Sequence, residues 1–89
     1  MRVFAILRLS EPAKVQAAIQ AAFPQDHLDL GSGEWLVAAA DKTSKDVADA
    51  IGVSEGENGL GMVLSIAGYW GRAPNNIWEW INAKQAQNG

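Results

Sequence analysis

Residues 3–23 read VFAILRLSEPAKVQAAIQAAF, a strand signal followed directly by a helix signal. Val3 to Leu9 are nearly all apolar, which is typical of a central strand buried on both faces. Ser10 can cap a helix that holds Glu11 and Pro12 in its first turn. The apolar residues of this helix recur at three- and four-residue intervals until the next proline, at Val15, Ala18, Ile19, Ala22 and Phe23. We therefore predict a buried strand followed by an amphipathic helix.

Two short runs after this helix predict a hairpin. His27 to Leu30 alternates polar and apolar residues, which favours a short strand near a sheet edge. Gly31-Ser32-Gly33 can form a tight connection, and Glu34 to Ala40 is a second apolar run. The sequence thus places two antiparallel strands after the first helix.

The remaining elements follow in the order helix, strand, helix. Thr43 and Asp46 have the spacing of a capping box, and the short helix that they open ends at Gly52. A fourth apolar strand runs from Leu60 to Tyr69. The chain ends in a helix over about residues 75–86, with Asn76 as the predicted N-cap and Glu79 as its capping-box partner.

This element order predicts an α+β fold, a ferredoxin-like βαββαβ sandwich with an antiparallel sheet and an extra C-terminal helix. Its 89 residues fit a single domain spanning 1–89. Either set of alternate residues in the first strand is largely hydrophobic, so both faces of the sheet need cover. The C-terminal helix could cover the second face, or a second copy of the chain could, through sheet-to-sheet or edge-to-edge contact.

Composition narrows the classes of partner. The net charge of −3 argues against the cationic surface that nucleic acid requires. No apolar run approaches the length of a membrane span, and the short N-terminal run does not resemble a signal peptide. The chain has no cysteine and no Asn-x-Ser/Thr site. We expect a cytoplasmic protein that binds neither nucleic acid nor membrane.

Aromatic residues are the unusual part of the composition. Four tryptophans occur in 89 residues, and three of them fall between positions 70 and 80. Such clustering suits an interface anchor or the wall of a pocket, and the alternative is that the rings fill a small core. The candidate interface or pocket residues are Tyr69, Trp70, Trp78, Trp80, Trp35 and Phe4.

Polar residues give no catalytic or metal-binding pattern. His27, the only histidine, is flanked by Asp26 and Asp29, but a zinc site needs further nitrogen or sulfur ligands, so we expect an exposed histidine on an edge strand. The acidic candidates for a metal-dependent nuclease are Asp29, Asp41, Asp46 and Asp49. Asp46 and Asp49 lie three residues apart on the second predicted helix, which is the pattern of an ordinary solvated face. We predict no catalytic residue, no metal site and no cofactor.

Four segments carry a family resemblance: Gly33-Glu34-Trp35-Leu36-Val37, Thr43-Ser44-Lys45-Asp46-Val47, Leu64-Ser65-Ile66-Ala67-Gly68-Tyr69-Trp70-Gly71 and Trp78-Glu79-Trp80-Ile81. The chain resembles small bacterial SinR-like proteins, relatives of the CRISPR-associated adaptation endoribonuclease and of the VapD toxin. The resemblance implies a ferredoxin-like fold and a strand-mediated homodimer. In the nuclease branch it also implies a metal-binding carboxylate at the end of the first strand.

This chain has Arg8 where the resemblance calls for that carboxylate. A guanidinium offers no lone pair to a divalent cation and repels it. We therefore expect a non-catalytic homodimeric interaction module, with an unidentified protein as a further candidate partner. The alternatives are a metal-dependent endoribonuclease or toxin-like protein of the same family, and a small-ligand-binding domain with a pocket beside the tryptophan-bearing C-terminal helix.

Overall fold

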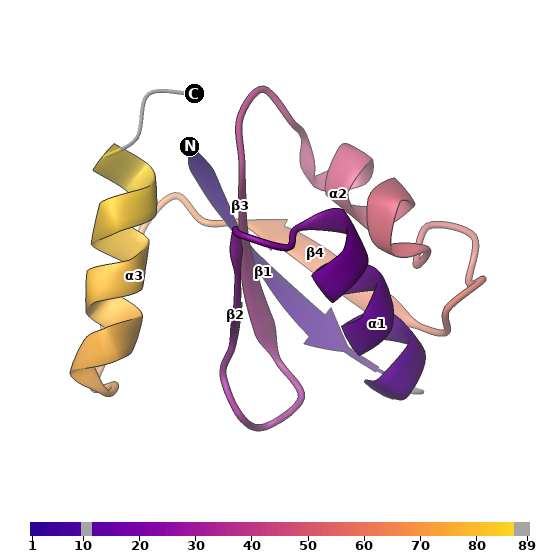
Figure 1. The fold of residues 1–89 in the computed structure, drawn as a ribbon, viewed down its shortest axis with the longest axis horizontal. Coiled ribbons are helices and arrows are strands. Elements are labelled where there is room, and N and C mark those ends of the chain that lie inside the picture. The colour runs from indigo at the N-terminus through magenta and orange to yellow at the C-terminus, as the bar shows by residue number, and fades with distance from the viewer. Residues whose placement is uncertain (10–11, 87–89) are drawn as a thin grey trace.

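The computed structural model describes residues 1–9 and 12–86 and shows a four-stranded sheet with three helices (Figure 1). The sheet has the order β2-β3-β1-β4, and each neighbouring pair is antiparallel. The elements are β1 (Arg2–Arg8), α1 (Pro12–Ala22), β2 (His27–Asp29), β3 (Trp35–Ala39), α2 (Ser44–Ile51), β4 (Gly61–Ser65) and α3 (Asn75–Ala86). The predicted α+β class is confirmed, and the arrangement is compatible with a ferredoxin-like sandwich. The predicted cap of α1, Ser10 with Glu11, lies outside the described residues.

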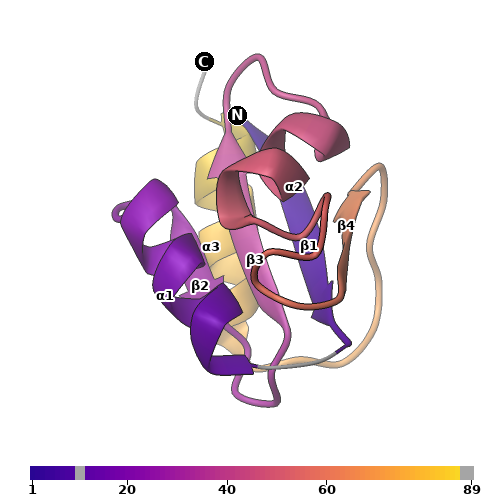
Figure 2. The same cartoon turned by 90° about the vertical axis from the view of Figure 1, so that its right-hand side faces the viewer.

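The sheet separates the helices into two layers. Figures 1 and 2 show α1 and α2 on one face and α3 on the other. Each face has its own apolar cluster. The cluster beneath α1 and α2 contains the buried residues Phe4, Ile6, Val15, Ile19, Trp35, Val37, Ala39, Val47, Ile51 and Val53. The cluster beneath α3 contains Val3, Leu36, Ala38 and Ile81.

Strand β1 contributes to both clusters, as its nearly continuous apolar sequence predicts. Phe4 and Ile6 point into the layer beneath α1 and α2, and both are fully buried. Val3 points to the opposite face, where it is also fully buried beneath α3. Because alternate side chains of a strand point to opposite faces, only an apolar residue at every position satisfies both layers.

The second helix has the predicted start and end. The Thr43 hydroxyl accepts a hydrogen bond from the Asp46 backbone N–H at 3.1 Å, and the Asp46 carboxylate accepts one from the Thr43 N–H at 2.9 Å. Gly52 then ends α2 with a φ of 77°, in the left-handed region that glycine adopts without strain. These local signals act within a few residues, which is why the sequence alone reveals them.

Two predicted boundaries are wrong. The fourth strand ends at Ser65 rather than Tyr69, because its antiparallel partner β1 offers no further residues for pairing. The Ile66 N–H already bonds to the Val3 carbonyl, near the start of β1. Helix α3 includes Asn75, so Asn76 lies inside its first turn and is not the N-cap. The first error arises because the end of β4 depends on its partner strand rather than on its own residues. The second is local, because the Ile77 N–H bonds to the Pro74 carbonyl at 3.0 Å and the first turn starts one residue earlier than predicted.

Helix α3 is attached to the sheet by both apolar and charged contacts. Ile81 is 4% exposed within the apolar cluster of the second face. The Lys84 Nζ lies 2.7 Å from Asp26 Oδ1 and 3.3 Å from the Gln25 carbonyl oxygen, in the segment before β2. These contacts join the last turns of the chain to the α1–β2 connection. Within the described residues, no helix is both long and apolar enough to cross a bilayer.

Candidate functional site

A group of large apolar side chains remains exposed on the face that α3 covers only in part. We call this group the β1–β4 apolar face. Its members are 37–63% exposed, and they are Leu7, Leu9, Leu60, Met62 and Leu64. Isolated exposed apolar side chains are common on protein surfaces, but these five lie on two adjacent strands or directly next to them and form one patch.

Strand register places these residues side by side. Leu7 lies opposite Met62, and Leu64 lies opposite Ala5. Leu9 extends the same alternation, and its N–H bonds to the Leu60 carbonyl at 2.9 Å. Directly opposite residues of an antiparallel pair share a face, so the patch runs along both strands. Helix α3 packs instead over the part of this face that β1, β2 and β3 form.

The patch borders a strand edge that pairs with no other described strand. Strand β4 stands at one end of the sheet, and β1 is its single neighbour there. Leu60 and Ile66 direct their backbone groups toward β1, and so do the even-numbered residues between them. The N–H and C=O groups of Gly61, Val63 and Ser65 therefore point outward. Residues 58–71 contain no charged side chain, and lysine or proline at such an edge is what usually prevents edge pairing.

Three of the predicted aromatic residues meet in one pocket. Tyr69, Trp70, Gly71, Trp78 and Asn82 line a cavity of about 400 Å³ between the β4–α3 connection and α3. The Tyr69 and Trp78 rings stack with centroids 5.5 Å apart and an interplanar angle of 22°. Trp70 is 98% exposed, so its indole protrudes into solvent. The clustering of these residues in sequence thus reflects a real cluster in space.

The other three aromatic candidates lie elsewhere. Phe4 is fully buried and Trp35 is 5% exposed, both in the cluster beneath α1 and α2. Trp80 packs against the cluster beneath α3, with the Lys84 Nζ 5.9 Å from the centre of its ring. The structure therefore assigns Phe4 and Trp35 to the core and separates them from the aromatic pocket.

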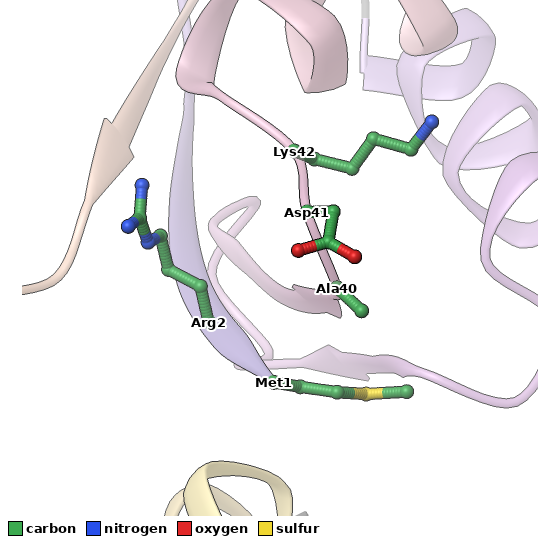
Figure 3. Close-up of a pocket in the computed structure, with 5 residues that line it drawn as sticks. All are labelled: Met1, Arg2, Ala40, Asp41 and Lys42. Carbon is green, nitrogen blue, oxygen red and sulfur yellow. The ribbon is translucent and has the colours of Figure 1, made fainter. Parts of the chain in front are cut away.

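A second pocket is polar. Met1, Arg2, Ala40, Asp41 and Lys42 line a cavity of about 360 Å³ where β1 begins and β3 leads into α2. Figure 3 shows that the Arg2 and Lys42 side chains point away from each other, on either side of the Asp41 carboxylate. Anion recognition requires donors that converge on one point. This arrangement does not bring the two cations together.

His27 lies on the edge strand β2, as predicted, but its side chain is not exposed. It is half-buried, its Nδ1 lies 2.5 Å from the Phe23 carbonyl oxygen, and its ring lies 5.6 Å from the ring of Trp35. The neighbouring carboxylates are directed elsewhere, Asp26 to Lys84 and Asp29 to the Gly31 N–H. The sequence neighbours of this histidine thus do not form a site with it.

The acidic side chains of α2 stabilise the helix itself. Hydrogen bonds from the Thr43 backbone N–H and from its side chain lower the pKa of Asp46. The Ser54 hydroxyl, followed by the Lys45 ammonium, lowers the pKa of Asp49, and Asp49 in turn raises the pKa of Lys45. In the described part of the chain, no three His, Asp or Glu side chains gather closely enough to hold a metal ion.

Asp46 gives the first testable prediction, a pH-dependent contribution to stability. Its lowered pKa in the folded state means that folding favours the carboxylate over the acid. That contribution is present above the ordinary aspartate pKa of about 3.9 and is lost as the pH falls through the lower folded value. We expect Asp46→Asn to be less stable than the wild type in urea at neutral pH, with the difference vanishing in strong acid. A difference that persists unchanged in strong acid would contradict this assignment.

Arg8 ends β1, where the family resemblance calls for a carboxylate. Its guanidinium packs against Gly33, where an added Cβ would collide with it. Its Nε is buried and has no hydrogen-bond partner within the described residues. Arg8 therefore occupies the end of the strand as a packed cation, a poor environment for a divalent metal ion.

Sequence reasoning missed the five residues of the β1–β4 apolar face and the polar member of the pocket, Asn82. The sequence does carry a signal for the β1–β4 apolar face, because it predicts that both faces of the sheet are apolar. Comparison with known proteins adds nothing to these assignments: no family model, no curated protein and no solved structure matches the chain.

Proposed function

We propose that this chain is a ferredoxin-like domain that acts as a homodimeric interaction module without catalytic activity of its own. The observation that carries the proposal is the β1–β4 apolar face beside the open edge of β4. The strand order and antiparallel pairing support the ferredoxin-like assignment. The packed guanidinium of Arg8 supports a non-catalytic role, because it stands where the sequence resemblance to the nuclease branch calls for a carboxylate.

A second copy of the same chain fits this edge by symmetry. If two β4 strands pair antiparallel about Val63, the outward groups of Gly61 meet those of Ser65 from the other copy, and the reverse contact follows from the two-fold axis. Met62 then lies opposite the other copy's Leu64 at a close, non-hydrogen-bonded pair. The two sheets become one continuous sheet with the exposed apolar residues joined across the seam.

The electrostatics of the edge also favour self-association. Two identical charged surfaces repel each other, whereas the uncharged segment over residues 58–71 brings no like charges together. The exposed apolar side chains lose contact with water when the strands pair, which supplies the driving force. A homodimer thus satisfies the unpaired backbone groups and the exposed apolar surface at once.

The oligomeric state is the direct test. Sedimentation velocity should show a mass twice the 9.5 kDa of the chain. Met62→Lys should weaken the dimer by at least about 100-fold, because it places two ammonium groups in the apolar seam. Ala83→Lys adds the same charge on the exposed side of α3 and should leave the dimer intact.

A double variant tests the strand register. With Met62→Lys and Leu64→Glu combined, each introduced ammonium faces an introduced carboxylate of the other copy, so the dimer should recover relative to Met62→Lys alone. A monomeric wild type at every concentration would refute the proposal. A dimer that Met62→Lys does not weaken would place the interface elsewhere and refute the proposed seam.

A further inference from the structure

The aromatic pocket at residues 69–82 has a prearranged wall. The Tyr69 hydroxyl donates to Asn82 Oδ1 at 3.0 Å, which ties the β4–α3 connection to the second half of α3. The same tyrosine ring lies nearly parallel to the ring of Trp78. A hydrogen bond and a ring stack together hold the two rings in place before any ligand arrives. Each ring turns one face to the other in this stack, so the wall offers a ligand their outer faces and edges. Such preorganisation lowers the entropy cost of binding.

The side chains of this wall keep several free donors, beside the Tyr69 and Asn82 oxygens, which can still accept. Tyr69 has used its only proton on the Asn82 oxygen, which leaves the Asn82 Nδ2 protons to donate. Across the described residues, the indole N–H groups of Trp70 and Trp78 make no hydrogen bond. An indole N–H can donate but cannot accept. A matching ligand therefore supplies acceptors such as carbonyl oxygens.

The charge and size of the pocket limit the ligand further. None of its five lining residues is charged, so nothing there compensates a phosphate or a carboxylate. Gly71 has no side chain, and a Cβ at that position would meet nothing, so one wall stays open. The volume of about 400 Å³ lies near the lower end of the range for small-ligand sites. The pocket suits an uncharged, apolar, carbonyl-bearing segment that can enter from the side.

We infer that this pocket binds a proline-rich peptide segment in the polyproline II conformation. Proline rings are flat-sided, apolar and uncharged, and they pack against exposed tryptophan and tyrosine rings in aromatic-lined grooves. The segment has no proline N–H to satisfy, and its solvated carbonyl groups accept from indole and amide donors. Its preformed helix loses little entropy on binding. The exposed Trp70 side chain forms the outer edge of this site. The inference does not depend on homodimerisation.

Nuclear magnetic resonance of the indole N–H groups provides the test, because the four tryptophans are distinguishable reporters. An end-capped peptide of about eight prolines, long enough for more than two polyproline II turns, is titrated into the labelled full chain. The Trp70 and Trp78 signals should shift and saturate, while the signal of the buried Trp35 stays in place. Trp70→Ala should weaken binding at least about tenfold without loss of folding, because its side chain is almost fully exposed.

A control variant and control ligands establish whether the shifts come from proline recognition at this pocket. Gln20→Ala, which shortens an exposed side chain of α1 on the opposite side of the sheet from α3, should bind the peptide like the wild type. Equal shifts with a glycine-serine peptide of the same length, or no shift with the proline peptide, would overturn the inference. Saturable shifts with a neutral oligosaccharide or a nucleoside but not with the proline peptide would overturn it as well. A Trp70 signal that responds only to protein concentration would assign the residue to contact between copies instead.

Discussion

Phe4→Ala is expected to lower the free energy of unfolding by about 3–5 kcal/mol, the range for a fully buried phenylalanine. Phe4 has no exposed surface and lies in the core beneath α1 and α2. A domain of this length has a total stability of about 4–13 kcal/mol, so this variant should be close to the unfolding threshold. Urea denaturation followed by circular dichroism gives the change directly.

The same experiment distinguishes a core role for Phe4 from the interface role that its sequence allowed. Phe4→Leu keeps most of the apolar volume and should cost clearly less than Phe4→Ala. Leu9→Ala removes a large apolar residue that is 62% exposed and should change the stability of the monomer by no more than about 0.5 kcal/mol. A small effect of Phe4→Ala on stability together with a large effect on self-association would contradict the core assignment.

Ile81→Asp is expected to detach α3 from the sheet. Ile81 is 4% exposed and packs against Val3, Leu36 and Ala38. The substitution removes this contact and would bury an unpaired carboxylate, which together cost at least about 3 kcal/mol. Release of α3 from the sheet avoids burying the carboxylate, and it exposes the second face of the sheet to water. Increased binding of a hydrophobic dye and a red shift of the total tryptophan emission, to which Trp80 contributes, should report the release.

Ala83→Asp is the matched control for this helix, because it adds the same charge at an exposed position two residues away. It should leave dye binding and the tryptophan emission unchanged. Amide hydrogen exchange completes the comparison: in Ile81→Asp, residues of α3 should lose protection while β1 and β3 keep most of theirs. Uniform loss of protection across the whole chain would mean that α3 and the sheet unfold as one unit.

The two expected losses of stability affect different layers of one sheet. The layer beneath α1 and α2 contains all but four of the residues in the two buried clusters, so damage there threatens the whole fold. The layer beneath α3 is smaller and covers only part of its face. That difference explains why the β1–β4 apolar face is available to a second copy of the chain.

The predictable parts of this protein are those that depend on short-range signals. Thr43, Asp46 and Gly52 mark the ends of α2 through bonds that span only a few residues. The alternation around His27 and the apolar run at β3 likewise predict the hairpin. The end of β4 was not predictable in this way, because it is decided by where β1 stops.

The aromatic site was predictable in part. The proximity of Tyr69, Trp70 and Trp78 along the chain correctly placed them near one another in the fold. Asn82 carries no such signal, since it reaches Tyr69 only after α3 has folded back over the connection. Phe4 and Trp35 illustrate the reverse case: an aromatic residue in a strand is compatible with a core or with a surface until its face is known.

The sequence by itself determined the α+β class, the element order and the apolarity of both sheet faces, because periodicity and capping are local properties of the chain. Only the tertiary structure decided which part of the second face α3 covers and which part stays open. That outcome depends on the register of β1 with β4 and on the docking of Ile81 and Lys84. Both are contacts between residues far apart in sequence, whose pairing no local pattern specifies.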